Sequence, residues 1–297
     1  MSAIIRTRYP SEPSDFADLR DAVTKYVLAG YAPEKPFLPR NGRVITLGSC
    51  FALTIHAALH KAGISSGHVA LAETVNTPPF ARIMLERARG NDVSSIGHAS
   101  GKMLAEENFV ALRADMMKAS AFILTLGVAL QPFHTDGLPI FDLSRAGIKE
   151  FGKAVLSGDY WRLLRVEEII AYIRGTIESA RALRPGLPIV LTLSPIPLTN
   201  SMGHASVVGQ DCISKSLIRV AIATLMDEQI PDVYYWPSFE IVRWVGGHVG
   251  PFFGTDGVDQ RHVSPACIDL ITSLFIEHFF EAKTASVTED SPEIRAL

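Results

Sequence analysis

Cysteine is scarce in this chain: its 297 residues include only three, Cys50, Cys212 and Cys267. An odd number of widely spaced cysteines does not build a disulfide framework and is typical of a reducing compartment. The sequence also has no stretch of roughly 18 uncharged apolar residues, and residues 1–16 contain no apolar segment of signal-peptide length. We therefore expect a cytoplasmic protein with no membrane span.

Positive charge is not in excess either. The 28 Lys and Arg residues are outnumbered by 31 Asp and Glu residues, the formal net charge is −3, and no segment is rich in Lys and Arg. Nucleic acids attract basic surfaces, so the composition argues against a nucleic-acid partner. The sequence contains no Walker loop and no dinucleotide fingerprint, and we expect no bound cofactor.

Apolar runs alternate with segments of helical periodicity along the chain. The runs 121–126 and 189–193 are nearly continuous in apolar residues, as is typical of strands buried on both faces of a parallel sheet. Further strands are predicted at 44–47, 68–71 and 233–236, and helices at 15–28, 51–61, 79–88, 105–118, 166–184, 210–226 and from 264 onward. This alternation predicts an α/β fold, a three-layer sandwich with a mostly parallel, flavodoxin-like central sheet. Ligands on such sheets bind at the carboxyl ends of the strands.

The domain is predicted to span residues 42–282. Residues 1–41 include three prolines among the last ten positions and one candidate helix, so we interpret them as an arm packed on the domain. The tail 283–297 is polar and is expected to be mobile. Within the domain, Thr135-Asp136-Gly137 lies between apolar flanks and predicts a hairpin turn at the rim.

The stretch RVITLGSCFALTIHAALHK, residues 43–61, combines a short strand, a tight corner and a helix. Such a corner places the residues after Gly48 at the carboxyl end of a strand and over the N-terminal end of a helix. Unpaired backbone N–H groups there favour a thiolate or an oxyanion, so Cys50 is a candidate nucleophile. The alternative is that Gly48 only turns the chain and Cys50 is a small buried apolar residue.

The same stretch resembles a known family. Gly48 to Ala52 spell GSCFA, the signature of the GSCFA domain family, a mostly bacterial group that is similar to the SGNH (GDSL-like) hydrolases. Other motifs follow in the family's order, so that the resemblance covers about residues 34–281: PEKPF at 33–37, NTP at 76–78, LTLG at 124–127, LSPIP at 193–197, SKS at 214–216, YWPSFE at 235–240 and DQRH at 259–262. The resemblance implies an SGNH-like fold and an acyl-ester hydrolase or O-acyltransferase. Its expected substrate is an acylated carbohydrate or small alcohol of surface-glycan metabolism.

The resemblance also implies roles for individual residues. In the GDSL-like pattern the nucleophile is the second residue after the glycine, which here is Cys50, while Ser49 takes the place of the pattern's aspartate. Cys50 is the favoured nucleophile, and Ser49 is the alternative. Asp259 and His262 stand just before the last predicted helix, where SGNH-like enzymes carry the acid and the base. Residues three apart on a loop can meet, so Asp259 is expected to orient the imidazole of His262, with Asp256 as the rival.

An acyl-transfer site needs donors for the oxyanion. The candidates are the backbone N–H of Cys50, the side-chain amide of Asn76 and the backbone N–H of Gly127. The alternative for Asn76 is a turn residue ahead of the prolines at 78 and 79. The sequence departs from the SGNH pattern here, because Val128-Ala129 stands where an Asn-Asp or similar pair is expected. Lys215 is a candidate for binding an anionic group of the substrate, and acyl-CoA is a candidate acyl donor. The missing Asn supports a second hypothesis, a non-catalytic SGNH-like binding module of a glycan-synthesis complex.

Two further expectations concern histidine and cysteine. His56 and His60 are four apart on a predicted helix, but no third ligand stands near them in sequence, so no metal site is predicted. Cys212 and Cys267 are next to apolar isoleucines in predicted helices, and we expect both thiols to be buried and unreactive.

Overall fold

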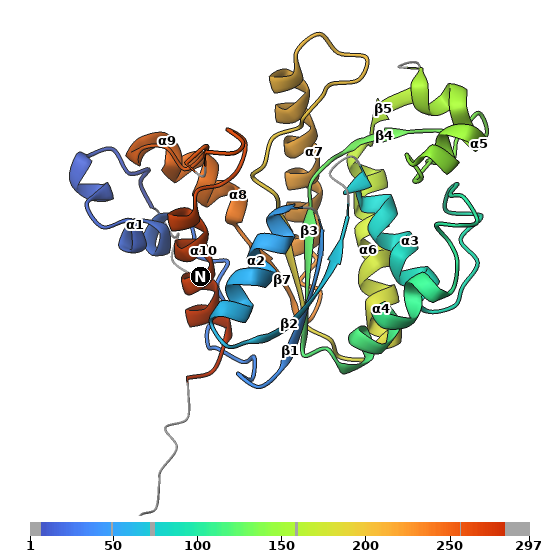
Figure 1. Ribbon diagram of the computed structural model, residues 1–297. Coiled ribbons are helices and arrows are strands. Elements are labelled where there is room, and N and C mark those ends of the chain that lie inside the picture. The colour runs from blue at the N-terminus through green and yellow to red at the C-terminus, as the bar shows by residue number, and fades with distance from the viewer. Residues whose placement is uncertain (1–6, 49, 72–74, 158–159, 256, 283–297) are drawn as a thin grey trace, which may run out of the picture.

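The computed structural model describes residues 7–48, 50–71, 75–157, 160–255 and 257–282. Its centre is a five-stranded sheet in the order β2-β1-β3-β6-β7, and every neighbouring pair of strands is parallel (Figure 1). The strands are β1 (Arg43–Gly48), β2 (Ser65–Ala70), β3 (Ala121–Leu126), β6 (Ile189–Leu193) and β7 (Val233–Trp236). The chain crosses back over β1 between β2 and β3, which is the flavodoxin-like strand order. The predicted α/β fold is therefore confirmed.

Helices cover both faces of the sheet. One face packs against α2 (Cys50–Lys61) and α10 (Pro265–Phe279), and the other packs against α3 (Pro78–Ala88), α4 (Glu107–Lys118), α6 (Val166–Leu183) and α7 (Val207–Asp227). A further helix, α1 (Leu19–Tyr26), adds to the core of α2 and α10. Each face of the sheet has its own hydrophobic core, because side chains along β3 alternate between the two faces. Ala121 and Ile123 belong to the core on the α2 and α10 side, and Phe122 and Leu124 belong to the core on the α3 and α6 side. All six residues of β3 are buried, as its continuous apolar run predicts.

Smaller elements decorate the carboxyl end of the sheet, at the top of Figure 1. An antiparallel ribbon joins β4 (Leu130–Pro132) to β5 (Trp161–Leu163), and α5 (Arg145–Leu156) lies in the chain between these two strands. The predicted turn near residue 136 is present, because Phe133 pairs with Pro139 and the backbone N–H of His134 donates to the carbonyl of Leu138 at 2.8 Å. The segments η1 (Pro13–Phe16), α8 (Ser238–Glu240), η4 (Ile241–Val245) and α9 (Gly246–Val249) complete the fold.

The N-terminal arm contacts the α10 side of the molecule. Its predicted helix at 15–28 is divided into η1 and α1, because the carboxylate of Asp18 accepts from the N–H groups of Arg20 and Asp21 and so begins a new helix. Val23 and Leu28 are buried in the same core as residues of α2 and α10. The tail 283–297 lies outside the described residues.

Membrane-spanning segments were also expected to be absent. Among the helices of the described residues, none combines the length and apolar character needed to cross a bilayer.

Candidate active site

The corner between β1 and α2 is closely packed around Gly48. A Cβ atom at this position would lie 2.8 Å from the Cβ of Thr125 and 2.9 Å from the Cβ of Ala52. Only glycine allows β1, β3 and the first turn of α2 to approach this closely. Cys50 is the first residue of α2 and is half-buried. Ser49, the alternative nucleophile, lies outside the described residues.

The position of Cys50 in the sheet is the one where open α/β sheets bind ligands. The chain leaves β1 toward β2 on one side and returns to β3 on the other side, so β1 and β3 flank the point where the strand order reverses. The crevice at the carboxyl ends of such strands is the usual ligand site. Cys50 follows β1 at this edge, over the N-terminal end of α2, where backbone N–H groups favour negative charge.

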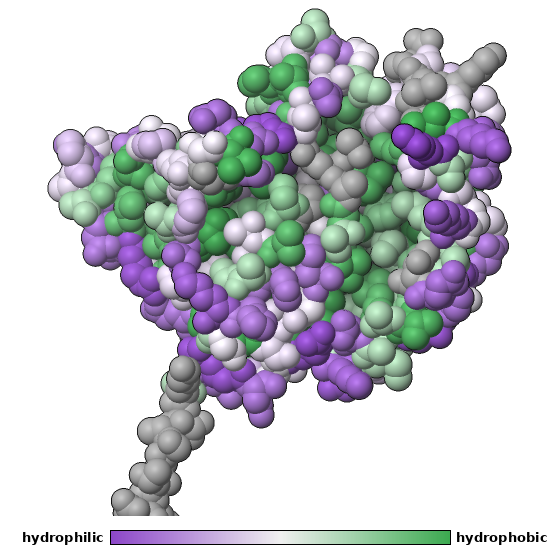
Figure 2. Space-filling model, in the orientation of Figure 1, coloured by the Kyte–Doolittle hydropathy of each residue, from purple (hydrophilic) through white to green (hydrophobic). Residues whose placement is uncertain are grey.

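Cys50 and His262 line the same cavity, which has a volume of about 430 Å³. The cavity lies between α2 and the start of α10, and its walls are largely apolar: Phe51, Leu53, Ile196, Val263, Pro265 and Ile268. Figure 2 shows hydrophobic residues on this face of the molecule above a lower rim that is mainly hydrophilic. The fold therefore brings the predicted nucleophile and the predicted base to one apolar cavity.

Backbone contacts hold His262 on both sides. The N–H of Gly254 donates to the carbonyl of His262 at 3.0 Å, and the N–H of His262 donates to the carbonyl of Asp259 at 3.0 Å. Two residues later, the hydroxyl of Ser264 accepts from the N–H of Cys267 and begins α10. The imidazole is therefore carried by a segment that is anchored to the N-terminus of a long helix.

The carboxylate of Asp259 contacts Arg261, for which the sequence predicted no role. Arg261 donates to Asp259 Oδ2 from its guanidinium at 2.7 Å and to Oδ1 from its backbone N–H at 2.8 Å. These hydrogen bonds from Arg261, with a smaller contribution from the nearby charge of His262, hold the pKa of Asp259 below its usual value. Asp259 is therefore ionised at neutral pH. Asp256 lies outside the described residues.

The other predicted site residues form a second group next to this cavity. Asn76, Gly127 and Lys215 line a cavity of only about 10 Å³, and the buried side chain of Ile196 lines both this cavity and the larger one. The carbonyl of Asn76 accepts from the N–H groups of Gly127 and Val128 at 3.3 and 3.1 Å. The Nζ of Lys215 donates to the carbonyl of Gly127 at 2.6 Å. Ile196 is thus shared by the cavity of Cys50 and the small cavity of Asn76 and Gly127.

Ser214, beside Lys215 on α7, also supports the end of β3. Its hydroxyl accepts from the N–H of Ala129 at 2.8 Å, and its side chain is fully buried. The SKS motif at 214–216 indicated these residues, but only the packing of α7 shows that two of them bind the backbone that follows β3.

The expectation for the remaining two thiols is half right. Cys267 is buried, and burial raises the pKa of its thiol to about 12. Cys212 is exposed on α7, so the prediction that it is buried is wrong. Its neighbour Ile213 is also exposed, which shows that an apolar neighbour in sequence does not place a residue on the buried face of a helix.

Comparison with known proteins settles the family. The model of the GSCFA family matches residues 43–275. This chain belongs to the GSCFA family. No curated protein matches the GSCFA chain in sequence.

Solved structures are similar to the GSCFA chain at low sequence identity. Salicylyl-acyltransferase SsfX3 from a tetracycline biosynthetic pathway is 12% identical with a TM-score of 0.40, and the match covers 80% of the GSCFA chain and 54% of SsfX3, about half of its length. A carbohydrate esterase family 3 protein from Talaromyces cellulolyticus is 11% identical with a TM-score of 0.37, over 79% of this chain and 94% of that chain. A protein described as a GDSL-like lipase from Parabacteroides merdae ATCC 43184 is 11% identical with a TM-score of 0.45, over 82% and 98%. Likenesses at these TM-scores carry no conclusion about the reaction of the GSCFA chain.

Proposed function

We propose that this GSCFA-family protein is an acyl-ester hydrolase or O-acyltransferase in which Cys50 is the nucleophile and His262 is the general base. The observation that carries the proposal is that both side chains line one apolar cavity at the point where the strand order reverses. The short sequence around Cys50 is shared with the family, but the convergence with His262 comes from the fold.

The reaction follows from the chemistry of the two groups. His262 accepts the proton of the Cys50 thiol, and the thiolate sulfur forms a bond to the acyl carbonyl carbon of the substrate. The bond to the leaving oxygen or sulfur then breaks, His262 returns the proton to the leaving group, and a thioester remains on Cys50. Water or the hydroxyl of an acceptor attacks the thioester in the second step and restores the thiol.

The electrostatics of the first turn of α2 support this sequence. Backbone N–H groups at the start of the helix stabilise the thiolate before attack and the oxyanion after it. The N–H of Cys50 is the proposed first oxyanion donor. The apolar walls of the cavity suit the acyl chain, and Lys61 and Asp269 line the same cavity with polar groups that suit an alcohol or sugar. Acylated carbohydrate remains the proposed substrate class, with acyl-CoA as an acyl donor in a transferase.

The contacts of Lys215 favour a different role from the predicted one. Its buried ammonium group donates to the carbonyl of Gly127, so it holds the end of β3 next to Asn76. We therefore propose that Lys215 positions this backbone, and that Asn76 is the further oxyanion donor if the substrate displaces Ile196.

One observation favours the second candidate, a non-catalytic binding module. The N–H groups of Gly127 and Val128 both donate to the carbonyl of Asn76, so neither is directed at the cavity of Cys50 in this structure. A site with only one oxyanion donor is a weaker catalyst, by roughly 100-fold or more for each donor lost.

The deciding experiment is intact-mass detection of a covalent acyl adduct after incubation with short acyl-CoA thioesters and p-nitrophenyl esters. We expect an adduct on the wild type and on the control Cys212→Ala, but none on Cys50→Ala. His262→Ala should slow acylation by about 100-fold or more, and Asp259→Asn should slow it less, because Asp259 acts through the imidazole. Activity that survives in Cys50→Ala but is lost in Ser49→Ala would assign the nucleophile to Ser49. Acyl substrate that binds the wild type without adduct or turnover would support the binding module.

A further inference from the structure

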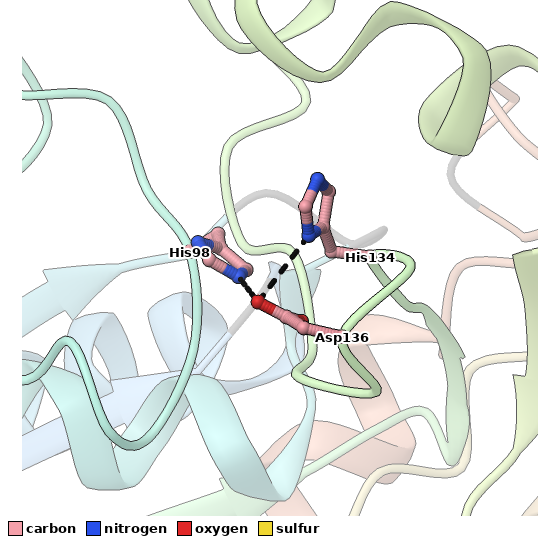
Figure 3. A group of neighbouring side chains, drawn as sticks. All are labelled: His98, His134 and Asp136. Atoms are coloured by element: carbon pink, nitrogen blue, oxygen red, sulfur yellow. Dashed lines mark hydrogen bonds and ion pairs between the residues drawn. The ribbon is translucent and has the colours of Figure 1, made fainter.

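Three side chains with metal-binding atoms meet at the rim of the domain, away from the cavity of Cys50. They are His98, His134 and Asp136, and one donor atom from each lies within 4.8 Å of the other two (Figure 3). None of the three lines the cavity of Cys50 and His262. Their neighbours Phe133 and Phe141 belong to the core on the α3 and α6 face, whereas Cys50 packs against the opposite core.

Backbone hydrogen bonds bring the two segments together. The N–H of His98 donates to the carbonyl of Pro139, and the N–H of Phe141 donates to the carbonyl of His98, both at 2.8 Å. His134 and Asp136 lie on the turn between Phe133 and Pro139, which pair with each other. The N–H of Leu138 donates to Asp136 Oδ1 at 2.9 Å. This last bond orients the carboxylate so that its second oxygen, Oδ2, faces the two imidazoles, as Figure 3 shows.

The distances between the donor atoms are close to those of a metal site. His98 Nε2 lies 2.7 Å from Asp136 Oδ2, and His134 Nδ1 lies 3.3 Å from the same oxygen. Zinc bonds of about 2.0–2.1 Å in a tetrahedral site require donor atoms about 3.3 Å apart. The second distance already has this value, and the first would open by about 0.6 Å as the ion replaces the proton between nitrogen and oxygen.

The surroundings hold the two imidazole rings in place. His134 Nδ1 is buried and forms no hydrogen bond with any of the described residues, although Asp136 Oδ2 lies 3.3 Å from it. Phe151 from α5 packs against both imidazole rings, with centroid distances of 5.7 and 6.3 Å. The rings are therefore held in place while their nitrogens share one oxygen.

We propose that His98, His134 and Asp136 bind one divalent transition-metal ion, of which zinc fits the donor set best. Two imidazole nitrogens and one carboxylate oxygen suit zinc, cobalt or nickel rather than calcium or magnesium, which require more oxygen ligands. Three protein ligands leave one coordination position for water or another ligand. The ion would join the segment of His98 to the turn 134–138, and so tie the rim next to α5 to the domain.

The test is calorimetric titration of the full chain, freed of metal with a chelator, with zinc chloride. We expect one zinc ion per chain, an affinity lowered at least tenfold in His134→Gln and in Asp136→Asn, and an unchanged affinity in His60→Gln. His60 is an exposed histidine on α2 and is the matched control. Hydrogen exchange of residues 133–139 should slow on addition of zinc in the wild type and in His60→Gln only.

Cysteine is the competing zinc ligand, so Cys50→Ala is titrated in parallel. The proposal is overturned if zinc binding is lost in Cys50→Ala, or if His134→Gln binds zinc as tightly as the wild type. It is also overturned if the wild type binds no zinc below the millimolar range. If the variants of the site do not fold, cobalt absorption of the wild type decides. Bands of a tetrahedral nitrogen and oxygen site support the proposal, and a thiolate charge-transfer band refutes it. Neither result bears on the acylation of Cys50, which is measured separately.

Discussion

The substitution Gly48→Ala tests whether the corner before Cys50 is built on close packing. The new Cβ would lie 2.8 Å from the Cβ of Thr125, 2.9 Å from the Cβ of Ala52 and 3.1 Å from the carbonyl oxygen of Thr125. Carbon atoms pack best at about 3.5–4.0 Å, so the two carbon–carbon gaps must open by about 0.6 Å or more. The neighbouring atoms are bonded directly to the backbone of β3 and α2, and no side-chain rotation relieves the overlap. We expect a loss of about 1–3 kcal/mol in the free energy of unfolding.

The same shift should affect the chemistry. Moving α2 away from β3 also moves Cys50 relative to His262, and a misplacement of about 1 Å costs about 100-fold in rate. Urea unfolding followed by circular dichroism measures the stability, and single-turnover acylation followed by intact mass measures the rate. The control is Gly152→Ala in α5, where a Cβ meets no atom within 4 Å and alanine is the better helix former. A Gly48→Ala protein with the wild-type unfolding midpoint and acylation rate would refute the argument.

Two further predictions concern thiol reactivity and pH. Iodoacetamide at neutral pH should label Cys50 and the exposed Cys212 but spare Cys267, because burial raises the pKa of the Cys267 thiol to about 12. Peptide mass spectrometry measures the labelling. Faster labelling of Cys267 than of Cys212 in the folded protein would contradict this prediction. Hydrogen bonds from Arg162 and from the backbone N–H of Arg165 lower the pKa of Glu168 from 4.5 to about 2. The carboxylate of Glu168 therefore stabilises the folded state above pH 4.5. This contribution is lost as the pH falls toward 2. Glu168→Gln should therefore lower the free energy of unfolding by about 1 kcal/mol at pH 7, after solvent screening, and by progressively less in more acidic solution. Glu167→Gln, on the exposed side of the same helical turn, should change little at either pH, and an equal loss in both variants would exclude the explanation.

Local patterns in the sequence determined most of the elements and their order. The strands predicted at 121–126, 189–193 and 233–236 have the same bounds in the structure. The first two are buried along their whole length, and strands buried on both faces require continuous apolar runs. The edge strand β2 begins three residues earlier than predicted, since an edge strand needs no such run and Ser65 and Ser66 give no strand signal. The glycine corner and Cys50 were also predictable, because they depend on neighbouring residues only.

Tertiary structure alone decided which distant residues meet. His262 reaches the cavity of Cys50 because α2 and α10 pack on the same face of the sheet, and Ile196, which follows β6, lines both that cavity and the small cavity of Asn76. His98 joins His134 and Asp136 only through backbone pairing across about 40 positions of the chain, a contact that no local periodicity encodes. The exposure of Cys212 likewise depends on which side of α7 the sheet covers. A sequence records each residue's preference for burial, but the identity of its neighbours is set by how the helices and strands pack.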